Sequence, residues 1–314
     1  MRTLHSETSK LVANCASLAA LLEVSAYPKP GNIHRLNDFP DTSYEHFLAG
    51  SVALGSVMGE LAARSYVNEN YVNTGLGKGV LDAVNEIFEW QHGGNTHLGV
   101  ALLFVPISAG AGKWHRTKSK NITELRKVIR KVIELATPDD SIYIYQAIEK
   151  AMPSKNLGKA EKLDIQDKES IKNIKNDNIT PLQIFQLCKD RDQICHEWVT
   201  GFETIFETGY PYLKSRLNDG TSVNSAIVDT YLHILSINHD SLIARKNGVA
   251  EAEKISRKAK WILELGGIDS EEGNKQLWIL DENLKKEDGR LNPGTTADLT
   301  AGSIFVLLLS GWRP

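Results

Sequence analysis

Cysteine is scarce in this sequence. The chain has three cysteines in 314 residues, Cys15, Cys188 and Cys195, and their spacing forms no paired set of metal ligands. An odd, sparse set of this kind fits a reduced cytoplasmic protein better than an exported one. The N-terminus also lacks a basic region followed by an apolar stretch and a small-residue cleavage site, so no export signal is predicted.

An excess of one charge is missing too. The 36 basic and 39 acidic residues leave a net charge of −3, which creates no broad field that would collect nucleic acid or anionic lipid. The longest apolar runs, 99–112 and 297–312, are shorter than the roughly 20 residues that a membrane helix needs. We therefore expect neither nucleic acid nor membrane as a partner, and we interpret both runs as buried helices. A homodimer is left open.

Apolar residues recur at helical spacing through most of the chain, which predicts an all-α protein with roughly a dozen helices. The clearest stripe runs over 194–206 and predicts one helix. A hydroxyl, a proline and a polar partner in order at 137–140 and 180–183 predict two capped helix starts. We expect a single multi-helix orthogonal bundle over 1–314, with a polar cleft formed by inter-helix loops and a polar insertion or mobile segment at about 154–178.

The segment 23–41, EVSAYPKPGNIHRLNDFPD, crowds charged side chains around two prolines and a glycine. A stiff turn with glycine lets backbone approach a phosphate closely. The alternative is an ordinary loop with solvated charges. This segment supplies one acid–base candidate, Glu23, and four phosphate-binding candidates, Lys29, Gly31, Asn32 and His34.

A second polar segment, GGNTHLG at 93–99, leads directly into an apolar run. Backbone amides at such a helix start can bind phosphate, with Asn95, Thr96 and His97 adding side-chain hydrogen bonds. A plain N-cap at Thr96 and a semi-buried His97 are the alternative. The nearby AGAGK at 109–113 is not a P-loop, because the first glycine and the final Ser or Thr are absent.

Three further carboxylates are candidates for catalysis. Glu197 lies on the helix of the 194–206 stripe, Asp240 precedes a short helix, and Asp298 enters the last apolar helix. A solvated helix face, an N-cap and a favourable helix dipole are their respective structural explanations. The cationic and amide side chains beside them are Arg245, Lys246 and Asn292.

Four segments, taken in order, resemble the triphosphoribosyl-dephospho-CoA synthase family. They are EVSAYPKPGN at 23–32, GGNTHLG at 93–99, HDSLIARK at 239–246 and LNPGTTADLTA at 291–301. The resemblance implies an enzyme that moves the triphosphoribosyl group of ATP to the ribose 2′-hydroxyl of dephospho-CoA and releases adenine. Its product is a precursor of the prosthetic group of citrate lyase or malonate decarboxylase carrier proteins.

Displacement at the anomeric carbon builds oxocarbenium character, so a carboxylate is needed to take the hydroxyl proton. Under the resemblance, Asp240 and Asp298 are expected as base or Mg²⁺ ligands, with Glu197 and Glu23 as second candidates for acid–base work. The phosphates would lie near Lys29, His97, Arg245 and Lys246, with Asn95 and Asn292 as positioning groups.

The sequence departs from the family pattern at 37–42, at 195–197 and at Leu98. A divergent member could transfer a ribosyl or phosphoribosyl group to another cofactor, or hydrolyse a related nucleotide. A helical module that binds a nucleotide without turnover is a second alternative. Convergence of Asp240 and Asp298 with Lys29 and His97 would favour an enzyme.

Overall fold

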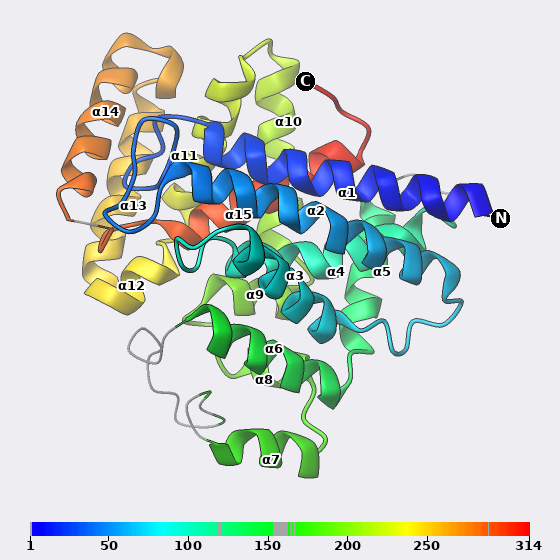
Figure 1. The fold of residues 1–314 in the computed structure, drawn as a ribbon. Helices are drawn as coiled ribbons and strands as arrows, with labels where there is room; N and C mark the ends of the chain where they lie inside the picture. Colours follow the sequence, from blue (N-terminus) through cyan, green and yellow to red (C-terminus); the bar gives the residue numbers. More distant parts are fainter. Residues whose placement is uncertain (1, 118–120, 153–162, 164, 166–167, 288) are drawn as a thin grey trace. The chain divides into compact units, whose positions relative to one another are not determined.

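The computed structural model describes residues 2–117, 121–152, 163, 165, 168–287 and 289–314. These residues form helices and no β-strand (Figure 1), which confirms the all-α prediction. They divide into two compact units. Unit 1 comprises 1–18, 49–190 and 194–202, and unit 2 comprises 19–48, 191–193 and 203–314. The single domain and the polar cleft remain predictions.

The helices follow one another along the chain. In order they are α1 (Arg2–Ser25), α2 (Tyr44–Val67), α3 (Leu76–Trp90), α4 (Leu98–Trp114), α5 (Ile122–Glu134), α6 (Pro138–Ala151), α7 (Lys168–Asn176), α8 (Pro181–Gln186), α9 (Gln193–Thr200), the π-helix η2 (Thr204–Gly209), α10 (Tyr210–Asn218), α11 (Val223–Ile237), α12 (Ser241–Asn247), α13 (Val249–Glu264), the 3₁₀ helix η3 (Gly267–Asp269), α14 (Glu271–Lys285) and α15 (Gly294–Leu309).

Each unit is built around one apolar helix. In unit 1, α4 is buried along nearly its whole length and packs against α3 and α5. In unit 2, α15 is buried to a similar extent and packs against η2, α10, α11 and α12. These two helices contain the apolar run 99–112 and residues 297–309 of the second run, which are buried nearly throughout, as predicted, whereas residues 310–312 follow the end of α15 and are not buried. A helix that is apolar on every side is stable only inside a core.

Helix α2 is long and apolar enough to cross a membrane, with a mean hydropathy of 1.2 over its apolar window. Half of that window is buried within the protein. Core helices of soluble proteins meet the same criterion, so this one helix is weak evidence for a membrane.

Both predicted capping boxes are present. The backbone N–H of Thr137 donates to Asp140 Oδ2 over 2.8 Å, and that of Thr180 donates to Gln183 Oε1 over 2.8 Å. Each bond supplies one half of the reciprocal cap that satisfies donors at a helix start. The sequence therefore places these two starts correctly.

The helix predicted over 194–206 is not continuous. Helix α9 ends at Thr200, and Gly201 and Phe202 follow in the left-handed region with φ of 66° and 64°. The backbone N–H of Phe202 donates to the carbonyl of Glu197 over 2.7 Å, as in a Schellman motif. The prediction is wrong here because the apolar spacing continues through a residue pair that ends the helix.

Only part of the predicted insertion at about 154–178 can be compared with the structure. Residues 154–162, 164, 166 and 167 lie outside the described residues. The described remainder includes α7, which packs against α6 in unit 1. That part of the segment is therefore helical.

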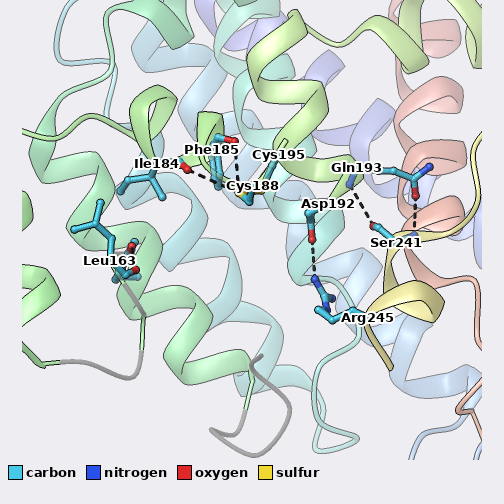
Figure 2. The surroundings of a disulfide bond; sticks show 10 residues. Leu163, Ile184, Phe185, Cys188, Asp192, Gln193, Cys195, Ser241 and Arg245 are labelled. Carbon is cyan, nitrogen blue, oxygen red and sulfur yellow. Dashed lines mark hydrogen bonds and ion pairs between the residues drawn. A yellow bond between two sulfur atoms is a disulfide. The ribbon is translucent and has the colours of Figure 1, made fainter. Parts of the chain in front are cut away.

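Cys188 and Cys195 form a disulfide in unit 1, with their Cα atoms 5.8 Å apart (Figure 2). The expectation of reduced cysteines is therefore wrong for this pair. Spacing alone does not reveal the bond, because residues 187–191 form a turn between α8 and α9 and bring the two side chains together. Cys15 is buried in α1.

We expect loss of this disulfide to destabilise the protein by about 2 to 3 kcal/mol, because the bond closes a short loop in the unfolded chain. The Cys188→Ser/Cys195→Ser variant should show this decrease in urea unfolding, and wild-type protein treated with reductant should match it. The variant itself should not respond to reductant. Equal stability of oxidised and reduced wild-type protein would contradict the prediction.

Candidate functional site

Residues 27–34 of unit 2, here called the KPG loop, connect the end of α1 to the region before α2. Helix α11 holds the start of this loop. The backbone N–H of Tyr27 donates to Asn224 Oδ1 over 3.0 Å, and Asn224 Nδ2 donates to the carbonyl of Tyr27 over 2.8 Å. The hydroxyl of Tyr231 donates to the carbonyl of Pro30 over 3.0 Å. The loop is thus fixed by the protein at several points.

Helix α14 holds the turn of the loop. Gly31 has a φ of 72° and lies so close to Leu284 and the carbonyl of Leu291 that a Cβ would clash with both. Its N–H donates to Asp281 Oδ1 over 3.1 Å, and Asp281 Oδ2 lies 3.3 Å from His34 Nε2. The glycine is therefore required for close packing on α14, and its N–H is directed at a protein carboxylate.

The Lys29 ammonium group lies inside unit 2 with no exposed surface. It forms an ion pair with Glu23 and donates to Asn32 Oδ1 over 3.3 Å, and Asn32 Nδ2 donates to Asn292 Oδ1 over 2.9 Å. Burial lowers the pKa of Lys29, an effect opposed first by Glu23 and also by Asp298. Burial raises the pKa of Glu23, and Lys29 opposes that rise. Because the pair is closed off from solvent, contact of Lys29 with a phosphate stays a prediction.

Asp298 is the one charged residue of α15, and the residue as a whole is partly exposed. Burial raises its pKa well above the ordinary value, and the neighbouring Glu23 and Asp240 raise it further, while Lys29 lowers it. Within the described part of the chain, no hydrogen bond or ion pair occupies this carboxylate. Its raised pKa makes it a stronger proton acceptor than an ordinary carboxylate.

Asp240 is fully buried and is the N-cap of α12, the structural role that the sequence favours for it. Its Oδ1 accepts the backbone N–H groups of Leu242 and Ile243 over 2.9 and 3.1 Å. Its Oδ2 accepts the N–H and the hydroxyl of Thr296 over 2.7 and 2.8 Å. Asp240 therefore joins α12 to the first turn of α15, and both of its oxygens are engaged.

The cations at the end of α12 face outward. Arg245 is exposed and pairs with Asp192 over 2.7 Å (Figure 2), and Lys246 is also exposed. Gln193 and Ser241 exchange two hydrogen bonds of 3.2 and 3.1 Å beside this pair. These cations are accessible to an anionic ligand, unlike Lys29.

The GGNTHLG segment lies in unit 1 and begins α4. The N-cap is His97 and not Thr96, while Asn95 is exposed and its Oδ1 accepts the N–H of Leu98 over 3.1 Å. The His97 ring is buried, with Nδ1 2.7 Å from Thr96 Oγ1 and Nε2 3.2 Å from Ser51 Oγ. The semi-buried histidine that the sequence offers as an alternative is thus present, and a phosphate role for this segment stays a prediction.

Burial lowers the pKa of His97 to about 3. The unfolded chain, with a histidine pKa of about 6.5, then binds more protons than the folded chain between those values. The free energy of unfolding should therefore decrease as the pH is lowered through this window, by about 1.4 kcal/mol per pH unit from this group. Urea unfolding at several pH values should show that the free energy of unfolding of His97→Gln depends less on pH in this window than that of wild type. A His97 ring that titrates near 6.5 by NMR would contradict the prediction.

Glu197 is fully buried in α9 of unit 1. The solvated helix face offered as its structural explanation is therefore wrong. At Gly201 the protein itself approaches closely, because a Cβ there would clash with the Arg130 side chain of α5. Arg126 Nε also donates to the Gly201 carbonyl over 2.7 Å. An acid–base role for Glu197 stays a prediction.

Unit 2 brings together four of the residues that the sequence selects. Glu23, Lys29, Asp240 and Asp298 are close enough for the charges of Glu23, Asp240 and Lys29 to shift the pKa of Asp298. These four residues come from α1, the KPG loop and the starts of α12 and α15, and we call them the carboxylate–lysine cluster. His97 and Glu197 belong to unit 1 and are described by themselves.

Comparison with protein families matches residues 9–314 to a family described as ATP:dephospho-CoA triphosphoribosyl transferase. The chain belongs to this family. The resemblance inferred from the four segments is confirmed, and membership identifies the chain as an enzyme of the transferase class.

Individual relatives agree with the family assignment. A Vibrio cholerae protein described as a probable 2-(5''-triphosphoribosyl)-3'-dephosphocoenzyme-A synthase is 23% identical over 309 residues, 95% of this chain and 87% of the relative. A Stutzerimonas stutzeri protein of the same description is 29% identical over 116 residues, 37% of this chain and 38% of the relative. A crystal structure assigned as a triphosphoribosyl-dephospho-CoA synthase from Archaeoglobus fulgidus has a TM-score of 0.63 and 28% identity, and the match covers 85% of this chain and all of that one.

Sequence reasoning missed Asp281, which contacts the KPG loop from α14. A signal was available, because Asp281 shares a helical stripe with Leu277, Leu280 and Leu284, and all four are buried. A carboxylate within an apolar stripe needs a partner inside the protein. That pattern could have predicted a buried polar contact for α14, although not its partner.

Proposed function

We propose that this chain moves the triphosphoribosyl group of ATP to the ribose 2′-hydroxyl of dephospho-CoA and releases adenine, with the carboxylate–lysine cluster as its catalytic centre. The family match over 9–314 is the observation that supports this reaction. Asp298 supports this location of the catalytic centre, because the residue is partly exposed, its carboxyl group has a raised pKa, and no hydrogen bond reaches that group within the described residues.

In this proposal Asp298 is the general base. A bond forms between the acceptor 2′-oxygen and the anomeric carbon of the ATP ribose, while the bond from that carbon to adenine breaks. The hydroxyl proton passes to Asp298, and the electron pair of the broken bond leaves with adenine, which takes a proton. A carboxylate with a raised pKa is a stronger base, which suits this transfer, and its negative charge stabilises the positive charge that builds on the ribose.

Glu23 and Lys29 support Asp298 from inside the protein. Lys29 opposes the rise in the pKa of Asp298, whereas Glu23 increases it, so their pairing adjusts how readily Asp298 gives up its proton. Asp240 acts mainly as the N-cap of α12, and it accepts the N–H of Thr296, which lies two residues before Asp298 in α15. We propose that the triphosphate lies toward the exposed Arg245 and Lys246, with Asn292 as a positioning group.

Mg²⁺ is part of the proposal. The ion is usually held in nucleotide enzymes by one or two carboxylates together with substrate phosphates, and Asp298 offers a carboxylate without a hydrogen-bond partner among the described residues. Asp240 fits this role less well, because both of its oxygens accept hydrogen bonds. When bound, Mg²⁺ would neutralise part of the triphosphate charge.

We also propose a cytoplasmic location, because ATP and dephospho-CoA are made inside cells. The Cys188–Cys195 disulfide is unusual for a reducing compartment. Rapid trapping of thiols in intact cells checks this part of the proposal. Free thiols trapped at Cys188 and Cys195 would agree with a reducing compartment, whereas a disulfide at these positions would count against it.

The test of function is incubation of purified protein with ATP, Mg²⁺ and dephospho-CoA, followed by chromatography and mass spectrometry. Free adenine together with a triphosphoribosylated adduct is the expected result. Adenine released only with another acceptor would favour ribosyl or phosphoribosyl transfer to that acceptor, and adenine released with water alone would favour hydrolysis. ATP binding without any product would favour the non-catalytic module.

A further inference from the structure

Asp281 combines three contacts that have no role in the reaction proposed above. Its Oδ1 accepts the N–H of Gly31 over 3.1 Å, and its Oδ2 lies 3.3 Å from His34 Nε2 and 2.6 Å from Lys285 Nζ. The carboxylate has no exposed surface. One buried side chain of α14 therefore holds both the turn and the far end of the KPG loop.

The His34 contact is directional. The N–H of Leu36 donates to His34 Nδ1 over 3.2 Å, so in the neutral ring the proton is on Nε2 and is donated to Asp281. Burial lowers the pKa of His34, which favours this neutral form, although Asp281 opposes the shift. The loop is thus held by two donors that meet one carboxylate.

Lys29, a member of the carboxylate–lysine cluster, is connected to these anchor points through the turn. It is two residues before Gly31, it pairs with Glu23, and Asn32, which follows Gly31, accepts its hydrogen bond over 3.3 Å. A shift of the turn would move the lysine and its amide partner together. The position of the Lys29 charge relative to Glu23 and Asp298 therefore depends on the turn.

We propose that Asp281 is a positioning residue for the transfer, which acts by fixing the Gly31 turn and thereby the place of Lys29 beside Glu23 and Asp298. This inference rests on the proposed function, because it assigns Asp281 to the same catalytic centre. Asp281 itself touches no reacting atom.

Asp229 supplies a matched control within the same unit. It is also buried, its Oδ1 accepts the N–H of Ile268 over 3.1 Å, and its Oδ2 pairs with Arg216 over 2.7 Å. It thus holds a backbone N–H and a basic side chain just as Asp281 does, but none of its hydrogen bonds or ion pairs reaches the KPG loop. Asp281→Asn and Asp229→Asn should therefore lose similar stability.

The two variants are compared by adenine release from ATP with Mg²⁺ and dephospho-CoA, across pH, and by hydrogen exchange of residues 27–34. We expect Asp281→Asn to lower kcat by roughly tenfold or more with little change in KM for ATP, as when an interaction is lost only in the transition state. The pH profile should shift toward higher pH, because a displaced Lys29 opposes the effect of Glu23 and Asp240 on the pKa of Asp298 less strongly. Residues 27–34 should exchange faster, whereas Asp229→Asn should leave all three readouts near wild type.

Each outcome decides one point. Equal kcat and equal pH profiles for the two variants, with active wild-type protein, would overturn the positioning role alone. Unchanged hydrogen exchange at 27–34 in Asp281→Asn would overturn the anchoring of the turn. Wild-type protein that releases no adenine would overturn the proposed function and, with it, the assignment of Asp281 to catalysis.

Discussion

The Asp298→Asn variant is expected to release adenine roughly 100-fold or more slowly than wild type, because it removes the proposed general base. Its fold should persist. Because the pKa of Asp298 is raised, the folded chain still holds its proton at pH values between the unfolded and the folded pKa, where the unfolded chain has lost it. This carboxyl group therefore reduces stability as the pH rises above its unfolded pKa, and the amide removes that loss. Adenine release and urea unfolding at pH 4 and pH 7 measure both effects.

Asp240→Asn is the contrasting variant. An amide nitrogen facing the N–H of Thr296 cannot accept its hydrogen bond, so we expect a stability loss of about 1 to 3 kcal/mol. Wild-type rates in Asp298→Asn would exclude the general-base role, whatever Asp240→Asn does.

We expect Lys29→Met to lower stability by about 3 to 5 kcal/mol, because it leaves Glu23 buried without its ion-pair partner. Adding Glu23→Gln should recover much of that loss, since replacing both members of a buried pair is far less costly than removing one. Adenine release should stay low in the double variant, because the charge beside Asp298 is still missing. Urea unfolding of the wild type, the two single variants and the double variant forms the thermodynamic cycle.

The Glu23→Gln single variant separates the two roles of the pair. If the double variant regained the wild-type rate together with its stability, Lys29 would serve folding alone. If the effects of the two substitutions on stability simply added, the ion pair would contribute nothing through mutual interaction.

Local chemistry was predicted well from the sequence. The caps at Thr137 and Thr180 depend on partners three residues away, and the buried helices α4 and α15 depend on composition within one segment. Such features are decided by neighbours along the chain. The break after Thr200 was missed because it requires a left-handed Phe202, a conformation that phenylalanine rarely adopts.

The site was predicted only in part. Glu23, Lys29, Asp240 and Asp298 were selected because motifs mark them, and they come together in unit 2. Their local partners could not be predicted, since the contact between Gly31 and Asp281 joins residues 250 positions apart. For the same reason the burial of Lys29, which removes it from direct reach of solvent, was not visible in a loop rich in charge.

The Cys188–Cys195 bridge makes residues 188–195 a covalent ring that contains two sites for a trypsin-like protease, Lys189 and Arg191. Arg191 is exposed, so the ring can be cut there. The two fragments would stay joined through the sulfur atoms and would migrate as one intact chain until a reductant was added. A limited-digestion experiment on this protein therefore gives different maps of accessible sites with and without reductant, although the peptide bonds cleaved are the same.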